Sequence, residues 1–148
     1  MIAPEIPHNA GAAGRLALAT GARLHLVKPL GFSLDDKHVR RTGLDYWKEV
    51  DVKVWEDFGE LRAAADPQAR FWMLSTKARR NHWEVDFADG DYLVFGCESR
   101  GLPEAMIHDA GDHALRIPMK EGATRSLNLS TAVAITLYEA VRQTGGIS

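Results

Sequence analysis

The chain has a single cysteine and no long apolar run, and both features narrow the class of protein. Because Cys97 is the only cysteine of the 148 residues, no disulfide can form within the chain, which is typical of a reducing compartment. No apolar stretch approaches the ~20 residues that span a bilayer. The first five residues have neither the basic nor the apolar region of a secretion signal. We therefore expect a cytoplasmic protein with no membrane segment.

The usual cofactor and metal motifs are also missing. The sequence has no G-x-G-x-x-G, no P-loop and no G-x-S-x-G elbow, so common dinucleotide, nucleotide and hydrolase sites lack support. Its six histidines show no paired ligand spacing, and one cysteine cannot build a zinc site. We expect no metal. His25 is interpreted as a packed strand residue, and Cys97 as a small buried side chain rather than a nucleophile.

The formal net charge of -2 argues against wholesale electrostatic binding to nucleic acid, although it leaves room for a local basic patch. Two basic groups, each followed by a tryptophan (Trp47 and Trp83), could hold RNA phosphates and stack on unpaired bases. The other interpretation is a solvated charged face. The groups are Lys37, His38, Arg40 and Arg41, and Lys77, Arg79, Arg80 and His82.

What remains is an ordinary globular composition, 45% apolar, that predicts one domain over residues 1–148. Apolar runs predict strands at residues 23–28, 52–55, 71–74, 92–95 and 114–119. Helices are predicted at 15–20, from 33 or 35 to 41, at 58–65, from Pro103, and at 129–143, after a loop over 1–14. This alternation predicts an α/β fold, with a mainly parallel sheet and helices on both faces.

Three of the predicted strands empty into polar or glycine-rich loops, at residues 75–77, 96–103 and 125–130. Ligands of open α/β sheets bind beyond the carboxyl ends of strands, so these loops predict one pocket for a small, partly polar ligand. Glu98 can meet a ligand hydroxyl or an arginine, or cap N–H groups of its own loop. Ser126, Asn128 and Ser130 exceed what one helix cap requires, which favours a shared capping and ligand role.

A further candidate precedes the first predicted helix, where residues 9–14 form a glycine-containing turn that leads to Arg15. Exposed N–H groups at such a turn favour an anion, and a guanidinium can hold a phosphate through two hydrogen bonds. A plain helix start with a solvated arginine is the alternative interpretation.

Together these segments resemble the SPOUT superfamily of knotted RNA methyltransferases, and within it the small bacterial enzymes that methylate the ribose of the tRNA wobble nucleotide. The resemblance covers nearly the whole chain, and its specificity lies in the order and spacing of its pieces. These are residues 4–11 with Arg15, 20–27, 29–32, 35–37, 40–46, 95–103, 116–119, 125–130 and 138–140. The family usually places a strand before this first piece, so we expect either an upstream start or an altered sheet edge.

The resemblance implies a Rossmann-like N-terminal part, a deep C-terminal trefoil knot and S-adenosylmethionine as cofactor, with S-adenosylhomocysteine as product. It also implies a homodimer in which Arg15 reaches the partner's site, and a tRNA anticodon stem-loop as partner. Arg15, Ser126 and Asn128 are the implied catalytic residues. The implied cofactor-binding residues are Leu74, Ser75, Thr76, Gly96, Glu98, Gly101, Ile117, Met119, Ser126 and Leu127.

Three alternatives stay open at this point. A related 2'-O-methyltransferase for another tRNA or ribosomal RNA position would share the pocket and differ at the basic surface. A knotted RNA-binding protein without catalysis would not need Arg15, Ser126 and Asn128. An unrelated doubly wound nucleotide-binding protein would have no knot and would transfer no methyl group.

Overall fold

The structure is a computed structural model that describes residues 1–35, 37 and 44–147. The helix expected to end at Arg41 falls largely outside these residues, as do the basic side chains of His38, Arg40 and Arg41.

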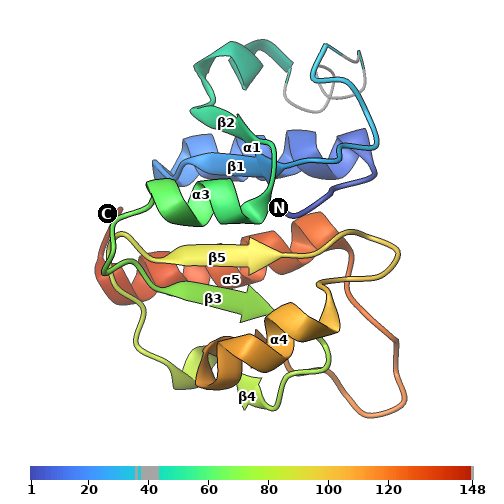
Figure 1. The fold of residues 1–148 in the computed structure, drawn as a ribbon, viewed down its shortest axis with the longest axis vertical. Helices are drawn as coiled ribbons and strands as arrows, with labels where there is room; N and C mark the ends of the chain where they lie inside the picture. The colour runs from blue at the N-terminus through green and yellow to red at the C-terminus, as the bar shows by residue number, and fades with distance from the viewer. Residues whose placement is uncertain (36, 38–43, 148) are drawn as a thin grey trace.

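The described elements alternate between strands and helices in the predicted way (Figure 1). The helices are α1 (Pro7–Thr20), α3 (Phe58–Ala64), α4 (Glu104–Ala110) and α5 (Leu129–Thr144). Short 3-10 helices are η1 (Leu44–Glu49), η2 (His82–Glu84) and η3 (Gly111–His113). The strands are β1 (Leu24–Val27), β2 (Val52–Trp55), β3 (Phe71–Leu74), β4 (Arg80–Asn81), β5 (Tyr92–Phe95) and β6 (Ala114–Arg116).

All strand pairings in the described residues are parallel. β1 pairs with β2, while the other four strands have the order β4-β6-β3-β5. Residues 1–3 connect the two groups: the Ile2 N–H donates to the Phe95 carbonyl and the Ala3 N–H to the Val27 carbonyl, both at 2.8 Å. The predicted mainly parallel sheet is thereby confirmed.

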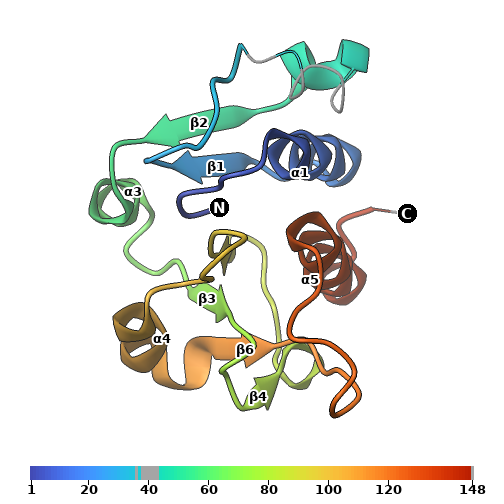
Figure 2. The same cartoon turned by 90° about the vertical axis from the view of Figure 1, so that its right-hand side faces the viewer.

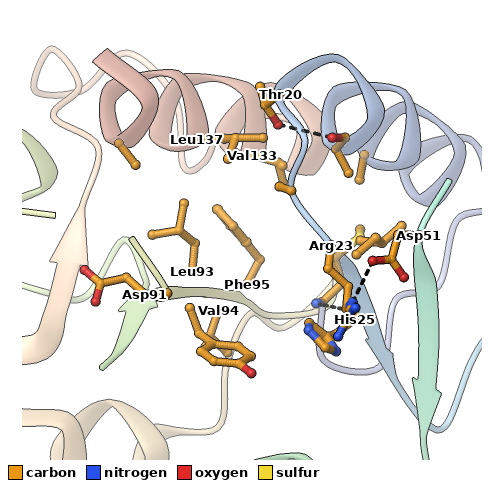
Figure 3. Close-up of a pocket in the computed structure, with 18 of the residues that line it drawn as sticks. Thr20, Arg23, His25, Asp51, Asp91, Leu93, Val94, Phe95, Val133 and Leu137 are labelled. Atoms are coloured by element: carbon orange, nitrogen blue, oxygen red, sulfur yellow. Dashed lines mark hydrogen bonds and ion pairs between the residues drawn. The ribbon is translucent and has the colours of Figure 1, made fainter. Parts of the chain in front are cut away.

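Helices cover both faces of the strands, as predicted. Figure 2 shows α1 and α5 together on one side and α3 and α4 on the other. Side chains along β5 alternate between these layers: Leu93 and Phe95 point towards Val133 and Leu137 of α5, and Val94 points the opposite way (Figure 3). Because apolar side chains enter both layers, packing in the core fixes the register of the strands. It thereby also fixes the positions of the loops that follow the strands.

The prediction of a loop over residues 1–14 is wrong for its second half, because α1 already begins at Pro7. Proline suits the first helical turn, but the residue before it, Ile6, has no side chain that can cap the helix. The cap is supplied by Glu98, whose carboxylate accepts the Ile6 N–H. The expected anion-binding turn at residues 9–14 is therefore helix interior. Since the cap lies 92 residues away in sequence, local patterns could not reveal it.

The other helix boundaries lie close to their predicted positions. α1 ends before Gly21, whose φ of 75° is a left-handed conformation that glycine adopts without strain. α5 begins after Asn128, whose side chain accepts the Thr131 N–H, and ends one residue later than predicted. Pro103 is the residue before α4 rather than its first residue. These ends are set by neighbouring residues, which is why sequence patterns could locate them.

His25 on β1 is a neutral packing residue, in line with its interpretation from sequence. The Trp55 indole N–H donates to His25 Nδ1 at 2.9 Å, which requires that nitrogen to be unprotonated. The ring also packs at 5.4 Å from the Tyr92 ring. Burial lowers the pKa of His25 from its ordinary 6.5 to about 4.

We therefore expect His25 to make the fold acid-sensitive. Between pH 6.5 and 4 the unfolded chain binds a proton at this residue that the folded chain excludes, so the free energy of unfolding falls as pH drops. The loss should be about 1–2 kcal/mol, since the ring is only half-buried. Urea unfolding between pH 4.5 and 7.5 measures it, and the His25→Asn variant should lose less stability than the parent.

His108, an exposed histidine on α4, provides the matched control. The His108→Asn variant should follow the pH dependence of the parent chain. Equal acid sensitivity in His25→Asn and the parent would contradict the role given to His25.

Candidate active site

A cavity of about 720 Å³ lies at the carboxyl ends of β3, β5 and β6. Its walls are the three segments that follow these strands, closed on one side by Ile6 and Asn9 and on another by the start of α5. The volume falls within the range of about 300–1,000 Å³ that is usual for small-molecule sites. The pocket that the loop positions predict is therefore present.

Every residue expected to bind the cofactor lines this one cavity. The set combines apolar side chains, small hydroxyl groups and two glycines, a lining suited to a ligand that is part apolar ring and part polar. The residues are Leu74, Ser75, Thr76, Gly96, Glu98, Gly101, Ile117, Met119, Ser126 and Leu127. Asn128, expected to act in catalysis, lines the same cavity.

The second loop is folded back on itself so closely that Gly96 cannot carry a side chain. An added Cβ would overlap the backbone of Gly101 and Leu102. The Gly101 N–H donates to the Cys97 carbonyl at 2.9 Å, and Gly101 itself has a φ of 70°. Gly96 and Gly101 both line the cavity, and neither carries a side chain that would keep a ligand away from the main chain.

The third loop is fixed through Asn128. Its side-chain oxygen accepts the Thr131 N–H at 3.2 Å and the Ser130 hydroxyl at 2.6 Å, and its amide donates to the Asn9 side chain at 3.2 Å. The predicted N-cap is thus confirmed, and Ser130 serves it. Ser126, by contrast, is an exposed residue of the cavity wall.

Glu98 lines the cavity, but its carboxylate oxygens already have partners. One accepts the Glu5 N–H at 2.8 Å, and the other accepts the Ile6 N–H at 2.6 Å and the Asn9 side-chain amide at 3.1 Å. These donors belong to neither a ligand nor its own loop, which were the alternatives left open by the sequence. Asn9, which the sequence places in the expected anion-binding turn, is only 4% exposed, and its side chain binds Glu98 instead of an anion.

Arg15 does not lie with the other implied catalytic residues. It is an exposed residue in the middle of α1 and does not line the cavity of its own chain. The structure therefore brings together Ser126 and Asn128 but places Arg15 apart from them, on a helix whose first turn touches the cavity through Asn9.

The basic surface differs in part from expectation. His82 is only 4% exposed, so it belongs to the interior and not to a charged face. Lys77 pairs with Glu104 at 2.8 Å, whereas Trp83 is 58% exposed. Trp47 is half-buried, and its ring lies so close to Gly14 that a Cβ there would overlap it. Of the two tryptophans, Trp83 alone keeps the exposure that stacking on a base requires.

A second cavity, of about 510 Å³, lies between α1, α5 and the strands β1 and β5. Figure 3 shows the side chains around it, which are mainly apolar. None of the residues singled out for chemistry lines it. Among the described residues, no group of three or more potential metal ligands gathers at one point, and no helix is long and apolar enough to cross a membrane.

The amino-acid sequence matches a known family over most of its length. The model of the SpoU rRNA Methylase family matches residues 1–138. The chain belongs to this family, and the RNA methyltransferase resemblance that the sequence motifs indicated is thereby confirmed.

Individual relatives are similar over nearly the full chain. A tRNA (cytidine(34)-2'-O)-methyltransferase of Saccharophagus degradans is 50% identical over 96% of this chain and 92% of its own length. A solved structure that concerns the 2-OH methylation of C/U34 on tRNA has a TM-score of 0.93 at 44% identity. The match covers 99% of this chain and 94% of the chain in that structure. The structure of the SpoU methyltransferase AviRb from Streptomyces viridochromogenes, in complex with AdoMet, has a TM-score of 0.83 at 28% identity. The match covers 96% of this chain and 55% of the AviRb chain.

Gly96 gives the sharpest test of the cavity wall. We expect Gly96→Ala to lower the free energy of unfolding by more than about 2 kcal/mol, because the new methyl group must displace the Gly101–Leu102 backbone. Chemical denaturation measures this loss. At Gly146, a Cβ would meet only the Thr144 hydroxyl at 3.6 Å, so Gly146→Ala should change stability little. Similar effects for both variants would mean that the tight loop is not required.

Proposed function

We propose that this chain transfers a methyl group from S-adenosylmethionine to the ribose 2'-OH of the wobble nucleotide, a cytidine or modified uridine, in a tRNA anticodon. The observation that carries the proposal is that one cavity collects every loop residue expected to bind the cofactor. Support for the substrate comes from relatives such as the tRNA (cytidine(34)-2'-O)-methyltransferase of Saccharophagus degradans, which is 50% identical to this chain.

The cavity fits S-adenosylmethionine in size and in lining. Leu74, Ile117, Met119 and Leu127 offer apolar contact for a base, while the backbone around Gly96 and Gly101 can approach a ribose or an adenine edge closely. When bound, the cofactor would supply a methyl group from a positively charged sulfur and remain as S-adenosylhomocysteine, and the proton of the 2'-hydroxyl would be released to solvent. Ser75 and Thr76 would contribute hydroxyl groups at the first loop.

The chain's own residues have to orient the acceptor ribose and hold its neighbouring phosphate. Arg15 is suited to both tasks, because a guanidinium donates several hydrogen bonds in a fixed, planar geometry. Ser126 and Asn128 on the cavity wall would place the ribose. Fixing this geometry accounts for up to roughly 7–11 kcal/mol of barrier lowering in well-oriented reactions.

Since Arg15 does not line the cavity of its own chain, we propose a homodimer in which Arg15 reaches the partner's cavity. Leu18 of α1 and Ile135 and Tyr138 of α5 are exposed apolar residues in one layer, with exposed fractions of 37%, 37% and 43% (Figure 2). Covering this layer with a second copy would bury those side chains.

The RNA would lie across the cavity mouth. Arg100 and Arg125 are exposed residues of the cavity lining and can pair with phosphates of an anticodon stem-loop despite the slightly negative chain. The remaining parts of the proposal are a single domain over residues 1–148, a deep trefoil knot formed by the C-terminal segment and a cytoplasmic location. A tRNA or ribosomal RNA target at another position is the alternative, favoured by the rRNA methylase family model.

Replacement of Arg15 tests the catalytic assignment. We expect Arg15→Ala to lower the rate of methyl transfer by at least about a hundredfold, because orientation of the ribose is lost. Binding of S-adenosylmethionine, measured by calorimetry, should be unchanged. Arg23→Ala is the control, since Arg23 is an exposed arginine that pairs with Asp51 away from the cavity. Parallel loss of cofactor binding and transfer would contradict the assignment.

Mixing two inactive variants tests the shared site. Arg15→Ala keeps an intact cavity and Gly96→Val keeps Arg15, so a mixed dimer has one complete site when Arg15 acts across the interface. Equal mixing after co-refolding should restore about a quarter of the parental transfer rate. Complete inactivity of the mixture, with mixed dimers demonstrated by differential tags, would show that Arg15 does not act on the partner's cavity.

A further inference from the structure

Two segments far apart in sequence hold each other at the edge of the cavity through reciprocal hydrogen bonds. The Glu5 and Ile6 N–H groups donate to the Glu98 carboxylate at 2.8 and 2.6 Å. In return, the Ser99 N–H and hydroxyl donate to the Glu5 carboxylate at 3.1 and 2.6 Å. These bonds lower the pKa of Glu5, so the carboxylate form is favoured.

The Glu98 carboxylate also lies at the N-terminal end of α1, where a helix favours an acceptor group. Ile6 is the residue before α1, and the first N–H groups of a helix need acceptors that the helix itself cannot supply. A carboxylate at this end is stabilised by the helix dipole as well as by direct hydrogen bonds. Glu98 thereby acts as the N-terminal cap of α1, although it belongs to the loop after β5.

Asn9 extends this contact to the third loop. Its amide donates to Glu98 at 3.1 Å and its oxygen accepts the Asn128 amide at 3.2 Å, so it uses both ends of its side chain. Asn128 in turn caps α5. Asn9 is nine-tenths or more buried, with 4% of its surface exposed. One buried amide therefore ties the first turn of α1 to the loop after β5 and to the start of α5.

We propose that Asn9 and Glu98 are positioning residues, which fix α1, and hence Arg15, relative to the cavity loops. The inference rests on the proposed function, in which Arg15 orients the acceptor ribose. Arg15 lies six residues after Asn9 on the same helix, so a shift of the first turn moves the guanidinium with it. Glu98 thus contributes through the helix that it caps, and not by holding the cofactor.

The Asn9→Asp variant tests this assignment. It replaces the amide donor with a second carboxylate about 3 Å from Glu98, while the oxygen that accepts from Asn128 is kept. We expect kcat for methyl transfer to fall at least about tenfold at pH 8, with the affinity for S-adenosylmethionine changed less than about threefold.

A second substitution provides the rescue. In Asn9→Asp/Glu98→Gln the new amide donates to Asp at position 9 and its oxygen still accepts the Glu5 N–H. The Ile6 N–H loses the acceptor that it has in Glu98, so the rescue is partial. Part of the lost kcat, at least about threefold, should return. Asp57→Ala is the control for simple destabilisation, because Asp57 caps α3 away from the cavity. It should lower the melting temperature and leave kcat unchanged.

Several results would overturn the inference. One is a kcat of Asn9→Asp equal to that of the parent chain. Another is a fall in its affinity for S-adenosylmethionine as large as the fall in kcat. The third is a kcat of the double variant no higher than that of Asn9→Asp. Failure of the proposed function would look different, since the parent chain itself would not methylate tRNA. In that case hydrogen exchange decides: Asn9→Asp should still weaken amide protection over the first two turns of α1, and unchanged protection would refute the positioning role.

Discussion

The pairing of β3 on both of its edges is the constraint on which the site depends. β3 pairs in parallel with β5 on one side and with β6 on the other, so the carboxyl ends of all three strands lie at the same edge. The loops that follow them are separated by tens of residues in sequence yet share one cavity. Because each strand carries apolar side chains into both helical layers, a register slip of one residue would move every side chain into the opposite layer and disrupt its packing. The core therefore fixes the geometry of the site.

A second constraint acts at the boundary between the sheet edge and the helical layer. α1 has no cap of its own, and a carboxylate from the loop after β5 supplies one. The same contact closes the cavity beside Ile6 and Asn9. In this way one set of hydrogen bonds satisfies a helix end and joins the start of the helix that carries Arg15 to the loop after β5. Stability and site geometry are linked through these few side chains.

The sequence predicted the parts of the fold that depend on local patterns. Apolar runs located β2, β3 and β5 at their observed bounds, and Gly21 and Asn128 marked helix ends that their own backbone or side chains determine. Loop positions, combined with the rule for parallel sheets, predicted the cavity. The resemblance to a family identified which loop residues are expected to bind the cofactor.

What the sequence could not predict depends on contacts between distant segments. The start of α1 depends on its cap, Glu98, which is distant in sequence. Asn9 falls within the predicted anion-binding turn, but its actual partners, Glu98 and Asn128, are distant in sequence as well. His82 was placed on a basic surface, whereas packing buries it. Gly14 suggested a turn, yet in the structure it makes room for the Trp47 ring inside a helix. In each case tertiary packing overrides a local propensity.

The central claim is that the cavity serves methyl transfer to the wobble ribose of tRNA. The most direct measurement is to incubate the parent chain with S-adenosylmethionine and total tRNA, then map methylated nucleosides by mass spectrometry of tRNA fragments. We predict a new 2'-O-methyl group at the anticodon wobble position and at no other. Methylation confined to another RNA position, or none despite measured binding of the cofactor, would contradict it.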